Sequence, residues 1–216
     1  MWQDVDDMLR ARGLLAPGTA ALPGRRFAGW IVGGALLYGA VMGAYSLRPL
    51  QMVYSSLKVP LLIAVSGLIC LPNLIVLNTI LGLRQDLGAV LRGAALAQGT
   101  VCVSLAALAP ITAVAYLSLD DYGDAVVFNG AVFLIAALGG QITLGRHYRP
   151  LIAANPRHRI ARDAWLVLYV FVAIQMGWVL RPFVGNPEQP TGFFRAGAWS
   201  NAYVEIAELL WQVAKR

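Results

Sequence analysis

The stretch VPLLIAVSGLICLPNLIVLNTILGL, which runs from Val59 to Leu83, decides the fold class of this chain. It is 25 residues long and carries no charged side chain. A helix of about 20 apolar residues is long enough to cross the hydrocarbon core of a bilayer, which is about 30 Å thick. Because backbone groups in lipid must form their hydrogen bonds within the segment, the stretch is predicted to be a transmembrane helix.

Four more uncharged runs predict further spanning helices. The five clear predicted spans are 27–47, 59–83, 93–119, 125–145 and 164–180. A sixth segment, 196–214, is apolar but carries Glu205 and Glu208, which are costly in lipid unless their face packs inward or the helix lies at the interface. We therefore expect an all-α, polytopic transmembrane helix bundle of five or six spans, formed by residues 27–216.

The composition excludes an ordinary soluble globular domain and gives no reason to expect a nucleic-acid partner. Hydrophobic residues make up 58% of the chain and charged residues only 13%, whereas a soluble domain has about 25% charged residues. The net charge of +6 comes from short basic clusters between the apolar runs. Such clusters are typical of cytoplasmic loops facing anionic lipid, so we expect the lipid bilayer as a partner and no nucleic acid.

Basic residues are distributed unevenly between the two sides of the predicted bundle. With the N-terminus in the cytoplasm, 11 basic residues lie inside and four outside before the C-terminal pair Lys215 and Arg216 is counted. This excess favours a cytoplasmic N-terminus, and Lys215 and Arg216 favour a sixth span. Residues 1–26 have no apolar core of a cleavable signal, and nearly all basic residues are Arg, as in GC-rich bacteria. We therefore expect a multi-pass protein of the bacterial inner (cytoplasmic) membrane.

Residues 1–26 are predicted to form a cytoplasmic amphipathic helix followed by a linker. Trp2, Val5 and Leu9 recur at helical spacing, with aspartates on the other side. The linker is marked by Pro17-Gly18 and Pro23-Gly24, which break helices. Two interpretations remain open, a solvated helix at the membrane interface or a helix that docks on a partner.

Small residues recur every four positions along the first predicted span and mark a candidate helix-packing face. Small side chains at this spacing let helix backbones approach closely in a membrane. Either another span of the same chain or a second protein can use such a face. The residues concerned are Gly29, Gly33, Ala35, Gly39 and Gly43.

The second predicted span contains features that interrupt a helix. Pro60 and Pro72 each remove a backbone hydrogen bond, and a kink is expected at Pro72. Broken helices with polar residues form midplane substrate sites in some transporters. The other interpretation is that Asn73 and Asn78 bond to neighbouring helices. A candidate polar face inside the membrane thus consists of Asn73, Asn78, Glu205 and Glu208.

An Arg-Pro pair follows three of the predicted spans, at Arg48-Pro49, Arg149-Pro150 and Arg181-Pro182. Arg suits the negative end of a helix dipole, and a following proline ends the helix, so these pairs predict helix termination. The second pair belongs to a cationic loop that also contains His147 and His158. Its arginines are a candidate contact for anionic lipid or an acidic partner, namely Arg146, Arg149, Arg157 and Arg159.

Residue patterns typical of catalysis are missing from the sequence. The five clear spans contain no Asp or Glu, and the two histidines have no carboxylate beside them in the sequence. Cys70 and Cys102 do not form a metal-binding or redox motif and are interpreted as buried apolar residues, with a disulfide as the alternative. The sequence therefore predicts a protein that is not an enzyme and has no cofactor or metal.

Three stretches of the chain resemble uncharacterised bacterial multi-span inner-membrane proteins. They are Leu57-Lys58-Val59-Pro60-Leu61-Leu62, Leu71-Pro72, and Gln175-Met176-Gly177-Trp178-Val179-Leu180-Arg181-Pro182-Phe183. The hydropathy layout is also similar to that of the Yip1-like membrane proteins. That resemblance implies a role in membrane organisation and assigns no catalytic residue.

Together these patterns favour a non-catalytic integral membrane protein. We expect a structural or accessory subunit of a membrane complex or a membrane-organising scaffold, with other membrane subunits or a second copy as partner. The alternative is a small-solute transporter or channel, which the kinked second span and the pair Glu205 and Glu208 would serve.

Overall fold

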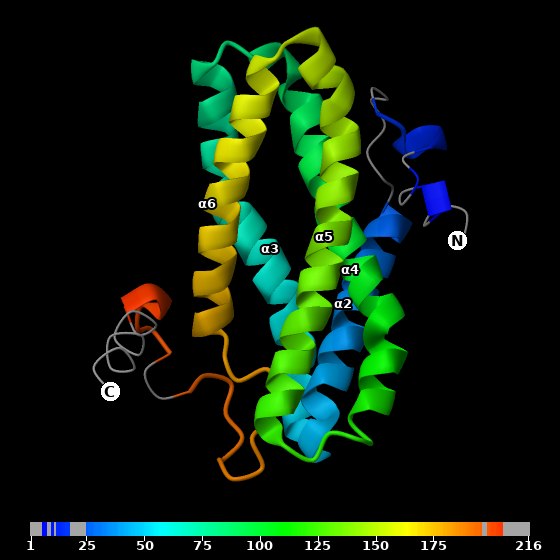
Figure 1. Ribbon diagram of the computed structural model, residues 1–216, viewed down its shortest axis with the longest axis vertical. Coiled ribbons are helices and arrows are strands. Elements are labelled where there is room, and N and C mark those ends of the chain that lie inside the picture. Colours follow the sequence, from blue (N-terminus) through cyan, green and yellow to red (C-terminus); the bar gives the residue numbers. More distant parts are fainter. Residues whose placement is uncertain (1–5, 8–9, 11, 18–24, 196–197, 205–216) are drawn as a thin grey trace.

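The computed structural model describes residues 6–7, 10, 12–17, 25–195 and 198–204, and these residues form a helical bundle (Figure 1). The prediction of an all-α fold is confirmed for this part of the chain, which contains no β-strand. Short 3-10 turns lie at Gly13–Leu15, Gly43–Ser46 and Arg84–Asp86. The main helices are α2 (Arg25–Met42), α3 (Pro49–Ile80), α4 (Leu87–Ala115), α5 (Tyr122–Ala154) and α6 (Arg157–Val179).

Four helical segments are long and apolar enough to cross a membrane. They are Pro49–Ile80, Arg84–Ala115, Tyr122–Ala154 and Arg157–Val179. They coincide with four of the five clear predicted spans. The remaining one corresponds to α2, where the described residues give a shorter apolar helix, Ile31–Ser46. In Figure 1, α3 to α6 run along the long axis of the molecule, whereas α2 covers only part of its length.

The prediction that Arg-Pro pairs follow helix ends is wrong at one of three places, Arg149-Pro150. Pro49 begins α3, because the first turn of a helix does not need the missing N–H and proline already has a helical φ. Pro150 lies inside α5, which continues to Ala154. Arg181-Pro182 follows the end of α6 at Val179, and Arg48-Pro49 follows the 3-10 turn Gly43–Ser46 that comes after α2.

The predicted interruption of the second span is also absent. Pro60 and Pro72 both lie inside α3, which is continuous from Pro49 to Ile80. Each proline removes one hydrogen bond, while the surrounding turns keep theirs. Helix α3 is therefore not broken at either proline.

Helix α2 and the 3-10 turn that follows it pack closely against α3 through two of the predicted packing glycines, Gly39 in α2 and Gly43 in the turn. A Cβ atom added at Gly39 would collide with the backbone of Ser55 and Ser56, and one added at Gly43 would lie 2.8 Å from the carbonyl oxygen of Gln51. Ala35 is buried in the same core. This half of the small-residue face thus serves contacts within the chain.

Buried polar side chains also connect the helices to one another. Tyr38 on α2 donates to Asn129 Oδ1 on α5 (2.9 Å), and Asn129 Nδ2 donates to the hydroxyl of Tyr116 (2.7 Å). Tyr116 in turn donates to the carbonyl oxygen of Met42 (3.0 Å). Further along the bundle, the hydroxyls of Thr100 and Thr143 are 3.0 Å apart. These groups hydrogen-bond to one another and so connect the helices. Without such partners, polar groups buried in this interior would destabilise the fold.

Candidate functional site

The most distinctive part of the molecule is a segment without regular helix that follows α6. We call residues 181–195 the strap. The strap crosses the end of the bundle at which α2 and α6 end and α3 and α5 begin, and it is drawn in orange in Figure 1. We call this end of the bundle the strap end, and the opposite end, with the α3–α4 and α5–α6 connections, the turn end.

Side chains at the start of α3 hold the strap in place. Arg48, Gln51, Ser55 and Lys58 follow one another at spacings of three and four residues, so they lie on one face of the helix. All four donate to backbone oxygens of the strap. Gln51 Nε2 lies 3.3 Å from Pro182 O and 3.2 Å from Phe183 O, and Ser55 also donates to Phe183 O. Arg48 donates to Gln189 O at 2.6 Å and to Pro187 O.

Lys58 is the least expected member of this face. The sequence places it in the loop between two spans, but it lies in the third turn of α3 and its side chain is fully buried. Its ammonium donates to Pro182 O at 2.7 Å and lies 5.0 Å from the centre of the Phe193 ring. A buried ammonium needs such acceptors, because an unpaired charge in the interior is strongly unfavourable.

A cavity of about 450 Å³ lies between the strap and the helices. The strap supplies most of the polar groups, and the helices supply a mostly apolar wall. The lining from the helices consists of Met42, Leu62, Tyr122, Val126, Gly130, Phe133 and Gly177. The lining from the strap consists of Arg181, Pro182, Phe183, Val184, Asn186, Gln189 and Arg195. Cavities of this size and character are typical of small-molecule sites.

Two arginines give the cavity its electrostatic character. The guanidinium carbon of Arg181 lies 3.2 Å from the centre of the Trp178 ring, and that of Arg195 lies 4.6 Å from it. The two cations therefore lie within about 8 Å of each other, which is the Debye length in physiological salt. Among the described residues, the lining contains no Asp or Glu. Arg195 Nε is buried and has no hydrogen-bond partner in the described part of the chain.

The cavity extends from the polar strap into the apolar bundle. Tyr122 and Phe133 both line it and are eleven residues apart on α5, a distance of about 16 Å along the helix axis. A Cβ atom added at Gly130 or Gly177 would meet no atom within 4 Å. The absence of side chains at these two glycines therefore leaves room on the α5 and α6 walls.

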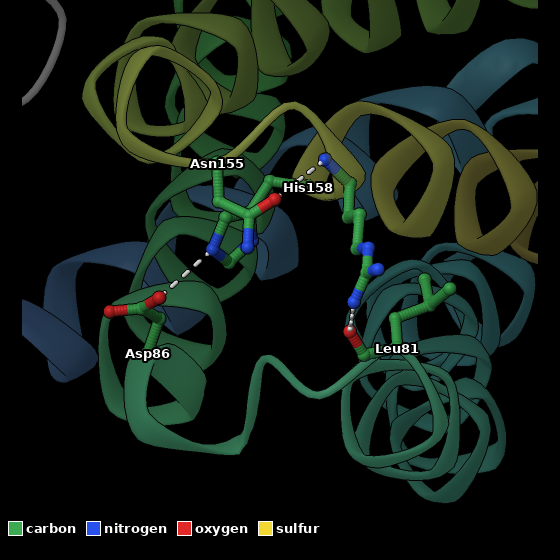
Figure 2. Close-up of polar contacts among 5 residues, drawn as sticks. Leu81, Asp86, Asn155 and His158 are labelled. Carbon is green, nitrogen blue, oxygen red and sulfur yellow. Dashed lines mark hydrogen bonds and ion pairs between the residues drawn. The ribbon is translucent and has the colours of Figure 1, made fainter.

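The turn end is closed by short connections and direct polar contacts (Figure 2). His158 Nε2 lies 3.0 Å from Asp86 Oδ2, and Arg157 donates to the carbonyl oxygen of Leu81 at 3.4 Å. Both histidines of the predicted cationic loop are buried, and His158, which has no carboxylate beside it in the sequence, has one in the structure. Asp86 is 72 positions away from His158, which is why the sequence did not reveal the pair.

The predicted cationic loop is formed by the ends of two helices. Arg146 and Arg149 lie in α5, and Arg157 and Arg159 lie in α6, with only two residues between the helices. All four side chains are exposed at the turn end. Their role as a contact for anionic lipid or an acidic partner stays a prediction.

A short N-terminal segment packs near the turn end. The imidazole of His147 lies with Nδ1 2.9 Å from Thr143 O and Nε2 3.1 Å from Leu15 O. Arg92, predicted in a loop, is buried in α4 and donates to Ala16 O at 3.4 Å. Most of the predicted amphipathic helix lies outside the described residues.

The remaining candidate residues do not come together in one site. Asn78 is buried and donates to Leu74 O of its own helix at 2.8 Å, whereas Asn73 is exposed. Gly29 and Gly33 are exposed on α2. Glu205 and Glu208 lie outside the described residues. Cys70 and Cys102 are buried and free, so the alternative of a disulfide is wrong.

These observations define a class of protein. Four apolar helices of sufficient length, joined by short connections and capped by a strap, indicate a helical membrane protein. In the described part of the chain, no group of three or more metal-ligating side chains occurs. Comparisons with protein-family models, with curated proteins and with solved structures give no match.

Sequence reasoning missed the strap and its cavity. One signal was present, since Arg48, Gln51, Ser55 and Lys58 form a polar face on an otherwise apolar helix. Such a face predicts a polar partner inside the protein. Which segment supplies that partner is a matter of tertiary structure, because Gln51 and Phe183 are 132 positions apart.

Proposed function

We propose that this chain is a non-catalytic accessory subunit of a membrane complex, located in the bacterial inner membrane with its N-terminus in the cytoplasm. The observation that carries the proposal is the exposed side chain of Asn73 on α3. Its amide has no hydrogen bond to any described residue. The nearest charged residue toward the turn end is Arg84, eleven positions away, or about 16 Å along a helix.

An amide at this position faces hydrocarbon if the chain is alone in the bilayer. Hydrogen bonds between membrane helices stabilise association by about 1–2 kcal/mol in model peptides and by less in some proteins. A polar group of a neighbouring subunit would supply the missing partner. The outward-facing Gly29 and Gly33 on α2 offer a second place for close helix contact.

A non-catalytic role is favoured over transport by how the interior polar groups are used. Tyr38, Asn129 and Tyr116 bond to one another, and Thr100 bonds to Thr143. Gln51, Ser55 and Lys58 bond to the strap. A transport path needs polar groups that can release these partners, and α3 is unbroken where a midplane site was considered.

The test is the size of the particle that mild detergent extracts from native membranes. We expect the tagged wild-type chain to migrate in a native gel as a particle of defined stoichiometry, larger than one chain. Asn73→Leu should shift the population toward the single chain, and Asn73→Gln, which keeps an amide, should shift it less. A single-chain wild-type particle, or an unchanged Asn73→Leu particle, would contradict the proposal.

Thr79→Val is the matched control for this experiment. Thr79 is also exposed on α3, but its hydroxyl already donates to Ile75 O at 2.8 Å. Removing that hydroxyl should leave the particle unchanged. Co-expression of a second, differently tagged copy then shows whether the partner is another copy or a different subunit.

A further inference from the structure

We propose that a groove between α3 and α4 binds the ring of a lipid-soluble quinone, with the side-chain amide of Gln98 as its hydrogen-bonding partner. The groove has a volume of about 230 Å³ and is lined by α3, by α4 and by Trp165 of α6. It is separate from the surface used in the accessory-subunit proposal, because Asn73 is exposed and does not line it.

The amide of Gln98 is the polar group that the groove offers to a ligand. Gln98 reaches from α4 across to α3, where a Cβ atom added at Gly67 would collide with its Nε2 and would lie 2.8 Å from its Oε1. The side chain is half-buried and has no hydrogen bond to any described residue. The indole N–H of Trp165 already donates to Cys70 O at 3.2 Å. An amide in apolar surroundings is unfavourable without a partner, so a ligand in this groove should form a hydrogen bond with Gln98.

Depth in the membrane argues against a phospholipid headgroup as that partner. Gly67 lies 18 and 13 residues from the ends of Pro49–Ile80, and Gln98 lies 14 and 17 residues from the ends of Arg84–Ala115. Both are therefore about 20 Å or more from either end of their helices. Half of the hydrocarbon core is about 15 Å thick, and the phosphate of a phospholipid lies outside it. The partner of Gln98 is then a molecule dissolved in the hydrocarbon or a group of another protein.

The dimensions of the groove favour a compact molecule over a helix of another subunit. On α3 the lining runs from Ala64 to Leu74, and on α4 from Leu91 to Gln98, which correspond to about 15 Å and about 10 Å along the helix axes. A transmembrane helix is about 30 Å long and would need a groove along most of that length. The volume is also below the roughly 300–1,000 Å³ of drug-sized sites, so one ring can enter while an apolar tail stays in the lipid.

A quinone ring matches the chemistry of the groove. Its carbonyl oxygens accept hydrogen bonds from the amide N–H groups of Gln98, and the hydroxyls of the reduced form donate to the amide oxygen, so one neutral side chain serves both forms. The leucine side chains of both helices and the Trp165 ring provide apolar and aromatic surface for a flat ring. An acyl chain would fill the same space but would leave the amide without a partner.

The experiment compares two probes by isothermal titration of the full chain in mild detergent. Decylbenzoquinone carries the carbonyl groups, and decylbenzene has the same tail on a ring without them. We expect the quinone to bind about fivefold more tightly, because a neutral hydrogen bond is worth about that factor in affinity. Equal affinities would overturn the proposal and would assign the groove to acyl chains. Binding of neither probe would also overturn it, and would assign the groove to a side chain of another subunit.

Gln98→Met keeps the length of the side chain but removes the amide. This variant should bind the two probes with equal affinity, because the hydrogen bond is lost while the groove keeps its shape. Gln141→Met is the matched control, since Gln141 lies within α5 and does not line the groove, and it should keep the preference for the quinone. An unchanged preference in Gln98→Met, or an equal loss in both variants, would show that Gln98 is not the binding group.

Ala95→Leu fills the groove without removing the amide. Ala95 is exposed and lines the groove, so a leucine there should abolish binding of both probes. Ala107→Leu, at an exposed position of α4 outside the groove, is the control and should bind them like the wild type. Both variants add an apolar side chain at an exposed position of an apolar helix, so both should keep the melting temperature of the wild type. If a folded Ala95→Leu protein binds the quinone like the wild type, the groove is not the site.

Discussion

The helix ends are held together by different contacts at the two ends of the bundle. At the turn end, the helices are joined by short connections, and His158 and Asp86 bond directly across them. At the strap end, a segment of irregular backbone covers the helices, and α3 side chains bond to its carbonyl oxygens. The strap end also holds a cavity of about 450 Å³ between the strap and the helices, lined by Arg181 and Arg195. The turn end is therefore secured by direct contacts between elements, whereas the strap end depends on contacts between side chains of α3 and the backbone of the strap.

The contact between α2 and α3 below the strap is expected to be the most sensitive point of the molecule. In Gly39→Leu the new side chain would meet the backbone of Ser55 and Ser56, which cannot move without disturbing the face that holds the strap. We expect the free energy of unfolding to fall by about 3 kcal/mol or more, measured by thermal unfolding in detergent.

Gly33→Leu is the control on the same helix. A Cβ atom added at Gly33 meets no atom within 4 Å and the residue is exposed, so stability should change by no more than about 0.5 kcal/mol. Equal losses for the two variants would contradict the close contact of α2 with α3.

The next largest effect is expected at the turn end. His158→Leu removes the buried partner of Asp86, and we expect a loss of about 1–3 kcal/mol of stability. Asp86→Asn keeps an acceptor within reach of the imidazole and should cost less. Both changes should leave amide hydrogen exchange within residues 181–195 unaffected. If His158→Leu makes exchange in the strap about tenfold faster, the two ends are not independent of each other.

Loosening the strap should have a smaller and more local effect. Gln51→Leu removes hydrogen bonds to Pro182 O and Phe183 O, each worth about 1 kcal/mol. We expect amide hydrogen exchange within residues 181–195 to become about tenfold faster, since 1.4 kcal/mol corresponds to a factor of ten. Exchange in α5 near Thr143 should stay as it is. Unchanged exchange in the strap would show that other contacts hold it.

The smallest effect is expected for Arg157→Ala. Its guanidinium is exposed and its bond to Leu81 O is long, at 3.4 Å, so the loss should stay below about 0.5 kcal/mol in thermal unfolding. A loss as large as that of His158→Leu would mean that the arginine, not the histidine, secures the turn end.

The apolar runs predict where the helices lie but not where they end. The run 125–145 marks the part of α5 that suits hydrocarbon, while the helix continues through Arg146, Arg149 and Pro150 to Ala154. Charged side chains in a terminal turn can reach water or headgroups, so they do not have to end a helix. Run length therefore measures hydrocarbon thickness better than it measures helix length.

The candidate site was much less predictable than the fold. From the sequence, Lys58 is predicted to lie in a loop, because a charge is costly in a membrane. Its burial depends on the carbonyl oxygen of Pro182, which accepts a hydrogen bond from its ammonium. The pairing of Arg181 and Arg195 at Trp178 likewise depends on how the strap folds back over the bundle. Neither contact leaves a periodic pattern in the sequence.

The difference between the two ends requires that they face opposite sides of the membrane, and cysteine labelling tests this most directly. Glu188 in the strap and Ala153 at the turn end are exposed, while Cys70 and Cys102 are buried and should stay unlabelled. In intact cells, a membrane-impermeant maleimide should label Glu188→Cys and should label Ala153→Cys only after the membrane is opened. Labelling of both from outside, or of Ala153→Cys alone, would contradict the account.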